Sequence, residues 1–284
     1  MLARRIERAE SELVGDIARG LARRERAAGS PGAERTFVVP LGGGLAISAG
    51  AESPVSKWIG LGLEGALDER EVERAEQLFA AAGTPVRVEL CELADPSVFA
   101  LFARRGYREI GREDVLALAL DGARVRELAR ARESRPAAIE VREVAPEGAA
   151  RWLEIVVEGF LAPDGSASTP PTESFAREAL ERVFADTLSV EGFALHLAFV
   201  DGAPAGGGGS RRRAGVVQLC GASTLPAMRG CGVQTALQIE RLLAASRAGA
   251  DLAVVTTEPD SSSQRNARAR AFERVYARRV LVRG

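Results

Sequence analysis

The sequence is poor in the residues that build metal sites, disulfide frameworks and membrane spans. Its 284 residues include three cysteines and one histidine. Cys91, Cys220 and Cys231 are too few and too scattered for a disulfide framework or a CxxC zinc site, so we expect no bound metal and a reducing, cytoplasmic location. No apolar run approaches the roughly 20 residues that a membrane span needs, and acidic residues within 1–24 disfavour a signal or transit peptide.

The chain also lacks an excess of either charge. Lysine and arginine total 38 against 39 for aspartate and glutamate, so the formal net charge is -1. This balance gives no general attraction to nucleic acid or to an anionic membrane, and we expect neither as a partner. With 46% hydrophobic residues the chain can bury one large core or two ordinary ones, and two domains are the better expectation at this length.

The periodicity of apolar residues predicts an α/β protein. An amphipathic helix is expected within 1–30, and β-like runs alternate with helices after it. One series occurs twice: helix, glycine, strand, helix, aromatic residue and strand follow in that order around Gly83 to Tyr107 and again around Gly249 to Phe272. This order indicates a diverged duplication. The run of glycines and arginines in 205–213 is interpreted as a mobile hairpin connection.

One loop in the second half carries residues suited to holding a phosphate. It lies between a strand ending near Thr224 and a helix starting near Gly230. Glycines in the loop allow a tight turn and a close approach to a ligand. The first turn of the helix offers unpaired N–H groups and a partial positive charge. The residues expected to bind the ligand are Thr224, Leu225, Arg229, Gly230, Cys231, Gly232, Val233 and Gln234.

This loop resembles the acetyl-CoA loop of the GNAT N-acetyltransferase superfamily, which reads Q/R-x-x-G-x-G/A. Arg229, Gly232 and Gln234 occupy the three signature positions, and Gln234 departs from the usual Gly or Ala. The resemblance implies a mixed-sheet α/β fold of two GNAT-like halves in tandem. It also implies acetyl-CoA as cofactor and transfer of the acetyl group to a primary amine of a small molecule or peptide. Asn266 resembles the asparagine that commonly contacts the cofactor in this family.

The resemblance is specific only in the second half. The expected organisation is an N-terminal helix in 1–30, a degenerate GNAT-like domain in 31–125, a linker in 126–137 and an acetyl-CoA-binding domain in 138–284. In the first half, two carboxylates of the stretch 63–68 stand where the pyrophosphate would lie, so we expect no CoA there. That half would shape the substrate cleft or form a homodimer.

The residues that would perform catalysis are not identified by the sequence. The family often has a tyrosine as proton donor, and Ala267 stands in its place. Glu158 and Glu258 are candidates for a base acting through water, and Tyr276 is a candidate acid. Each also fits a structural interpretation, as a surface charge or as a tyrosine packed in a strand.

Two other functions stay open at this point. A non-catalytic acyl-CoA-binding or sensing protein would need neither base nor tyrosine. An NAD-dependent enzyme is a further alternative, because Gly230 and Gly232 begin a pattern like G-x-G-x-x-G/A and Glu258 follows at a plausible distance for binding ribose. Thr235 in place of the last small residue, and the short chain remaining after Glu258, count against that alternative.

Overall fold

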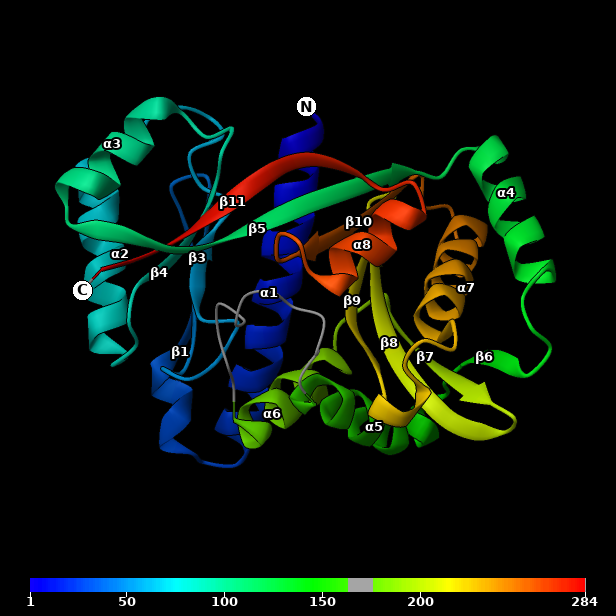
Figure 1. Cartoon of the computed structure of the whole chain (residues 1–284). Helices are drawn as coiled ribbons and strands as arrows, with labels where there is room; N and C mark the ends of the chain where they lie inside the picture. Colours follow the sequence, from blue (N-terminus) through cyan, green and yellow to red (C-terminus); the bar gives the residue numbers. More distant parts are fainter. Residues whose placement is uncertain (163–175, 284) are drawn as a thin grey trace. The chain divides into compact units, whose positions relative to one another are not determined.

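The computed structural model describes residues 1–162 and 176–283, which form two compact units (Figure 1). Unit 1 comprises Met1–Val115 and the described parts of Pro171–Val190 and Arg274–Gly284. Unit 2 comprises the described part of Leu116–Pro170 together with Glu191–Glu273. Both units combine strands with helices, which confirms the predicted α/β class.

Unit 1 contains a mixed sheet in the order β1-β2-β3-β4-β11-β5. β11, from the end of the chain, lies between β4 and β5 and pairs antiparallel with β4, from Arg278 opposite Cys91 to Val282 opposite Arg87. Its elements are α1 (Leu2–Ala27), η1 (Pro31–Arg35), β1 (Thr36–Leu41), β2 (Gly44–Ala49), β3 (Lys57–Ile59), α2 (Glu69–Ala81), β4 (Arg87–Cys91), α3 (Pro96–Arg104), β5 (Tyr107–Ala119), α6 (Arg177–Thr187) and β11 (Glu273–Arg283).

The domain ranges expected from sequence remain a prediction, and the two compact units have boundaries of their own. The described parts of 171–190 and 274–284 fall within the expected second domain, yet they cluster with unit 1. The reason is that α6 packs against α1 and that β11 supplies a strand to the unit 1 sheet. Of the expected linker 126–137, the first part is helical, because α4 (Gly122–Glu133) extends through it.

Local sequence accounts for the helices of unit 1. The Asp68 side chain accepts a hydrogen bond from the Arg70 N–H and forms a capping box with Glu71 at the start of α2. The Asp95 side chain accepts a hydrogen bond from the Ser97 N–H at the start of α3, directly ahead of Pro96. The two helices cover an apolar core with edge-to-face aromatic pairs, among them Trp58 and Phe102, Phe102 and Tyr107, and Phe37 and Phe79.

A buried ionic contact joins α1 to the final strand inside unit 1. The Tyr276 hydroxyl donates to Oε1 of Glu7 over 2.6 Å, and Nε of Arg278 donates to the same oxygen over 2.7 Å. The three residues are at most 1% exposed. Because a buried charge without its partner is costly, this contact fixes the register between α1 and β11.

The strands of unit 2 follow the order β10-β9-β8-β7-β6, with the end of β5 beside β10. Strands β6 to β9 pair antiparallel, whereas β9 and β10 pair parallel. The elements of unit 2 are the end of β5, α4, β6 (Ile139–Glu143), η2 (Pro146–Gly148), α5 (Ala149–Leu161), β7 (Phe193–Val200), β8 (Ala203–Arg213), β9 (Val216–Thr224), η3 (Pro226–Met228), α7 (Val233–Arg247), β10 (Leu252–Thr257) and α8 (Ser262–Ala269).

The glycine run is a buried strand, and its interpretation as a mobile hairpin is wrong. A Cβ added at Gly206 would lie 2.6 Å from the Ser223 carbonyl oxygen and 3.0 Å from Val233 of α7. One added at Gly207 would lie 2.7 Å from Val156 of α5. The glycines therefore let α7 and α5 approach opposite faces of β8 more closely than side chains would permit.

The expected duplication is present in the order of elements. Helix, strand, helix and strand follow one another as α2, β4, α3 and β5, and again as α7, β10, α8 and β11. Gly83 and Gly249 each follow the first helix of the series with φ values of 64° and 84°. Within the described residues, no helix combines the length and the apolar character required to cross a membrane.

Replacing Gly206 by alanine is expected to destabilise the protein by about 1–3 kcal/mol, because the added carbon meets backbone rather than a movable side chain. Urea denaturation at fixed pH measures the change in the free energy of unfolding. Gly122→Ala is the matched control, since its Cβ would touch only the end of the Arg126 side chain at 3.4 Å. Equal stability of the two variants would contradict the packing described for β8.

The carboxyl of Glu113 on β5 is expected to make stability depend on pH. Burial and the nearby Glu89 carboxylate raise its pKa to about 7. A raised pKa means that the folded state holds the proton more tightly, so this contribution to stability is present at acid pH and is lost as the pH rises toward 7. Glu113→Gln should therefore stabilise the protein at pH 8 more than at pH 5.5 in denaturant titrations. The exposed Glu273→Gln serves as control, and a shift of the same size there would contradict the assignment.

Candidate functional site

The loop after β9 ends in a helix that no side chain caps. Gly230 and Gly232 have φ values of 79° and 86°, a region that favours glycine. Gly232 is the N-cap of α7, which begins at Val233 rather than at Gly230 as expected, and no side chain accepts a hydrogen bond from the first turn. No acidic residue stands in that turn. The exposed stretch 229–232 therefore leads into a helix end suited to an anion.

The strands that flank this loop pair over only part of their length. β9 and β10 share three register positions, which end at Val254 opposite Gln218. β9 continues beyond this point to Thr224, and β10 continues to Thr257. The far edge of β9 stays paired with β8 as far as Thr224 opposite Gly206. Main-chain groups on the β10 side of β9 are thus released from the ladder directly before the loop.

Arg229 fastens the loop to the end of α5. Its Nη2 donates to the carbonyl oxygens of Ala162 over 3.1 Å and Gly159 over 3.4 Å, and its Nε donates to Thr224 over 3.4 Å. The last carbonyls of a helix lack partners within the helix, and a cation suits that end of the helix dipole. Arg229 therefore holds the loop against the end of α5.

The other expected loop residues divide between anchors and exposed groups. Val233 is buried in a small apolar cluster with Leu237, and the Leu225 N–H donates to the Ala205 carbonyl oxygen over 2.9 Å. Cys231 is exposed, and Gln234 is half-buried with an Oε1 that has no hydrogen-bond partner.

The expected catalytic candidates belong to different units. Glu158 is exposed on α5, and Glu258 is half-buried directly after β10 in unit 2. Tyr276 belongs to unit 1, where its fully buried hydroxyl donates to Glu7. Burial raises the pKa of Tyr276 above its usual range. β11 thus carries Tyr276 into the unit 1 core, which encloses its hydroxyl.

The buried Arg241 side chain braces unit 2 behind β8, and sequence reasoning missed it. Arg241 on α7 is 1% exposed and donates to the carbonyl oxygens of Gly209 over 2.9 Å and Leu237 over 3.0 Å. Its position inside an apolar helical stretch was the available signal. Burial, followed by Arg241, lowers the pKa of His196 to about 4, so this histidine stays neutral at neutral pH.

The segment after β10 carries the predicted cofactor residue Asn266 and the aromatic residue Phe272. Asn266 lies half-buried on α8. Ala271 has a φ of 62°, a conformation that favours glycine, and Phe272 packs into the unit 2 core. In the described part of the chain, no group of three His, Cys, Asp or Glu side chains could hold a metal ion.

No family model and no curated protein matches the sequence, but solved structures match the fold. A GCN5-related N-acetyltransferase from Kribbella flavida has a TM-score of 0.61 at 20% identity, over 92% of this chain and 95% of that one. A tandem GNAT protein from the clavulanic acid biosynthesis pathway has a TM-score of 0.56 at 17% identity, over 95% and 94%. The chain has the tandem GNAT fold. A GCN5-related N-acetyltransferase from Sphaerobacter thermophilus has a TM-score of 0.55 at 19% identity, over 76% and 67%.

The tandem GNAT fold also decides against the dinucleotide alternative. A dinucleotide-binding fold is built from an open, mostly parallel sheet. In unit 2, neighbouring strands from β6 to β9 pair antiparallel, and β9 pairs parallel with β10. The glycine pattern of the loop after β9 is therefore no dinucleotide fingerprint.

The two halves of the GNAT fold differ at the equivalent loop. In unit 1, Asp68 caps α2, and Glu69 and Glu71 make its first turn acidic. A Cβ at Gly60 would lie 2.4 Å from Oγ of Ser11, so α1 packs directly on this loop. An anion at the start of α2 would meet carboxylate oxygens and atoms of α1, whereas residues 229–232 ahead of α7 are exposed.

Arg229→Ala is expected to loosen the loop, because three carbonyl contacts are lost together. Hydrogen–deuterium exchange should show faster uptake in 225–234 than in the wild type, with unchanged uptake in unit 1. The control is Arg268→Ala, which removes an exposed arginine from α8. Unchanged exchange in Arg229→Ala would show that these contacts do not hold the loop.

Proposed function

We propose that the protein is a GNAT-type acetyltransferase that moves an acetyl group from acetyl-CoA to a primary amine of a small molecule or peptide. The observation that carries the proposal is the start of α7, which follows two left-handed glycines and has neither a capping side chain nor an acidic first turn. The tandem GNAT fold supports it, because the likeness covers nearly the whole chain.

The donor site is built by the loop and the two strands before and after it. The N–H groups at Gly232, Val233 and Gln234 would bind the pyrophosphate, because helix N-termini stabilise anions. The pantetheine arm would follow the unpaired edge of β9 beyond Gln218. The other residues assigned to the cofactor are Thr224, Leu225, Arg229, Gly230, Cys231 and Asn266.

Bound acetyl-CoA would supply the thioester, whose C–S bond breaks as the amine nitrogen forms the new C–N bond. The released β9 edge offers main-chain donors for the developing oxyanion. Glu158 and Glu258 are the carboxylates of unit 2 that could take the proton of the amine through water. Neither Ala267 nor the enclosed Tyr276 can return a proton to the thiolate, which leaves this step to solvent.

The absence of that proton donor favours a second candidate function, a non-catalytic acyl-CoA-binding or sensing protein. The two candidates differ in turnover rather than in binding. Release of CoA thiol should be followed with acetyl-CoA and a panel of peptides, polyamines and small amines. Turnover of any amine supports the transferase, and acetyl-CoA binding without turnover of any amine supports the sensor.

Gln234→Glu is expected to weaken acetyl-CoA binding at least tenfold, because it places a carboxylate of the same size in the first turn of α7. A calorimetric titration measures the dissociation constant. Gln77→Glu, an exposed position on α2, is the matched control. This variant is cleaner than Gly232→Glu, which would also strain a backbone of φ 86°. Equal affinity of Gln234→Glu and the control would overturn the loop assignment.

A further inference from the structure

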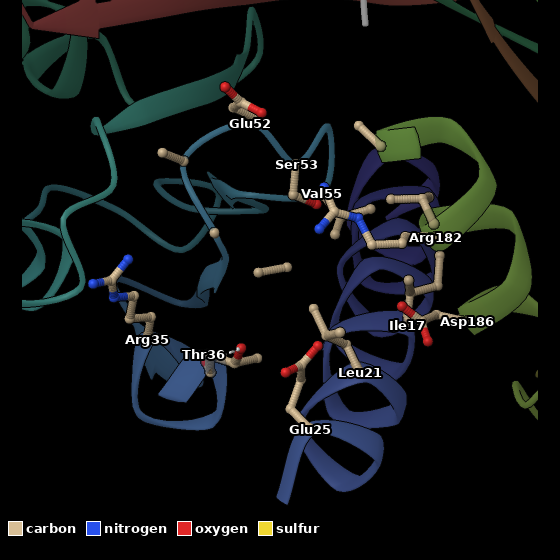
Figure 2. A pocket seen from close by; sticks show the side chains of 16 residues that line it. Ile17, Leu21, Glu25, Arg35, Thr36, Glu52, Ser53, Val55, Arg182 and Asp186 are labelled. Atoms are coloured by element: carbon tan, nitrogen blue, oxygen red, sulfur yellow. Dashed lines mark hydrogen bonds between the residues drawn. The ribbon is translucent and has the colours of Figure 1, made fainter. Parts of the chain in front are cut away.

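A cavity of about 340 Å³ lies in unit 1 among α1, α6 and the loop after β2 (Figure 2). Thr36 at the start of β1 and Ala49 at the end of β2 both line it, and they are partners in the sheet register. β3 runs antiparallel to β2, so Gly60, just after β3, lies toward the opposite end of the unit 1 sheet. The cavity is therefore not the unit 1 counterpart of the acyl-CoA loop.

One side of the cavity is apolar. Ile17 and Leu21 come from α1, Val183 comes from α6, and Val55 comes from the loop after β2. The volume falls at the small end of the range for ligand sites, roughly 300–1,000 Å³. A wall of this kind suits a short aliphatic group.

Five charged side chains line the same cavity: Glu25, Arg35, Glu52, Arg182 and Asp186. Glu25 enters from α1 and Arg182 from α6, and Figure 2 shows both side chains turned toward the hollow. These two groups form no ion pair with each other among the described residues. Asp186 is already engaged, because its Oδ2 accepts from Nη2 of Arg24 over 3.0 Å.

A buried hydroxyl completes the lining. Oγ of Ser53 is enclosed and has no hydrogen-bond partner. An enclosed polar atom without a partner carries a desolvation penalty, which a ligand atom of suitable polarity would relieve. The lining thus combines an unsatisfied hydroxyl, cationic and anionic side chains and an apolar wall.

We propose that this cavity binds a small zwitterion with an aliphatic side chain, of the free α-amino acid class. Arg182 and Ser53 donate to its carboxylate, and Glu25 accepts from its ammonium group. The aliphatic group packs against Ile17 and Leu21. The inference does not rest on the acetyltransferase proposal, since every residue it uses belongs to unit 1.

The test is calorimetry of the full-length protein without acyl-CoA, with L-leucine as the probe. We expect saturable binding of L-leucine and at least tenfold weaker binding of L-leucinamide, which lacks the carboxylate, and of 4-methylpentanoate, which lacks the ammonium group. No binding of L-leucine at 10 mM, or equal binding of all three compounds, would overturn the proposal. These arms use the wild type, so they do not depend on whether a variant folds.

Variants then locate the site. Arg182→Gln and Glu25→Gln should each weaken L-leucine binding at least tenfold, with folding checked by circular dichroism. Arg177→Gln on α6 and Glu34→Gln in η1 are the matched controls, because neither residue lines the cavity. Unchanged affinity in both test variants would place the ligand elsewhere and overturn the assignment.

Discussion

A helix whose first N–H groups have no capping side chain must find hydrogen-bond acceptors elsewhere, and α7 is such a helix. Much of unit 2 serves to hold this end of the helix in place. The glycines of β8 admit α7 and α5 to opposite faces of the sheet, and Val233 anchors the first turn in an apolar cluster. Arg229 then ties the loop to the last carbonyls of α5.

In unit 1 the equivalent position, at the start of α2, is occupied by the protein's own side chains. Asp68 accepts a hydrogen bond from the first turn of α2, and Ser11 of α1 packs against Gly60. The duplicated halves have thus diverged by sequence changes at one loop while keeping the order of their elements. The proposed function therefore requires a single acyl-CoA site per chain, in unit 2.

The loop could be predicted from sequence because its signals are local. Gly230, Gly232 and Arg229 stand within one short segment, and their positions in the structure follow from backbone geometry and the helix dipole. The caps Asp68 and Asp95 are signals of the same kind, because each stands directly before its helix. Signals of this kind need no knowledge of distant contacts.

The remaining features depend on contacts between segments far apart in the chain. Nothing within β11 shows that it pairs with β4, so Tyr276 could not be placed in unit 1 beforehand. The glycines of β8 have the composition of a flexible connection, and only the helices on both faces explain them. The charges at the cavity of unit 1 come from α1 and α6, whose proximity no sequence pattern indicates.

Calorimetric titration of the intact protein with acetyl-CoA tests the central claim most directly, because it counts the sites as well as measuring their affinity. The open start of α7 and the filled loop of unit 1 together require one molecule of acetyl-CoA per chain. A stoichiometry of two, or no binding at all, would contradict the account.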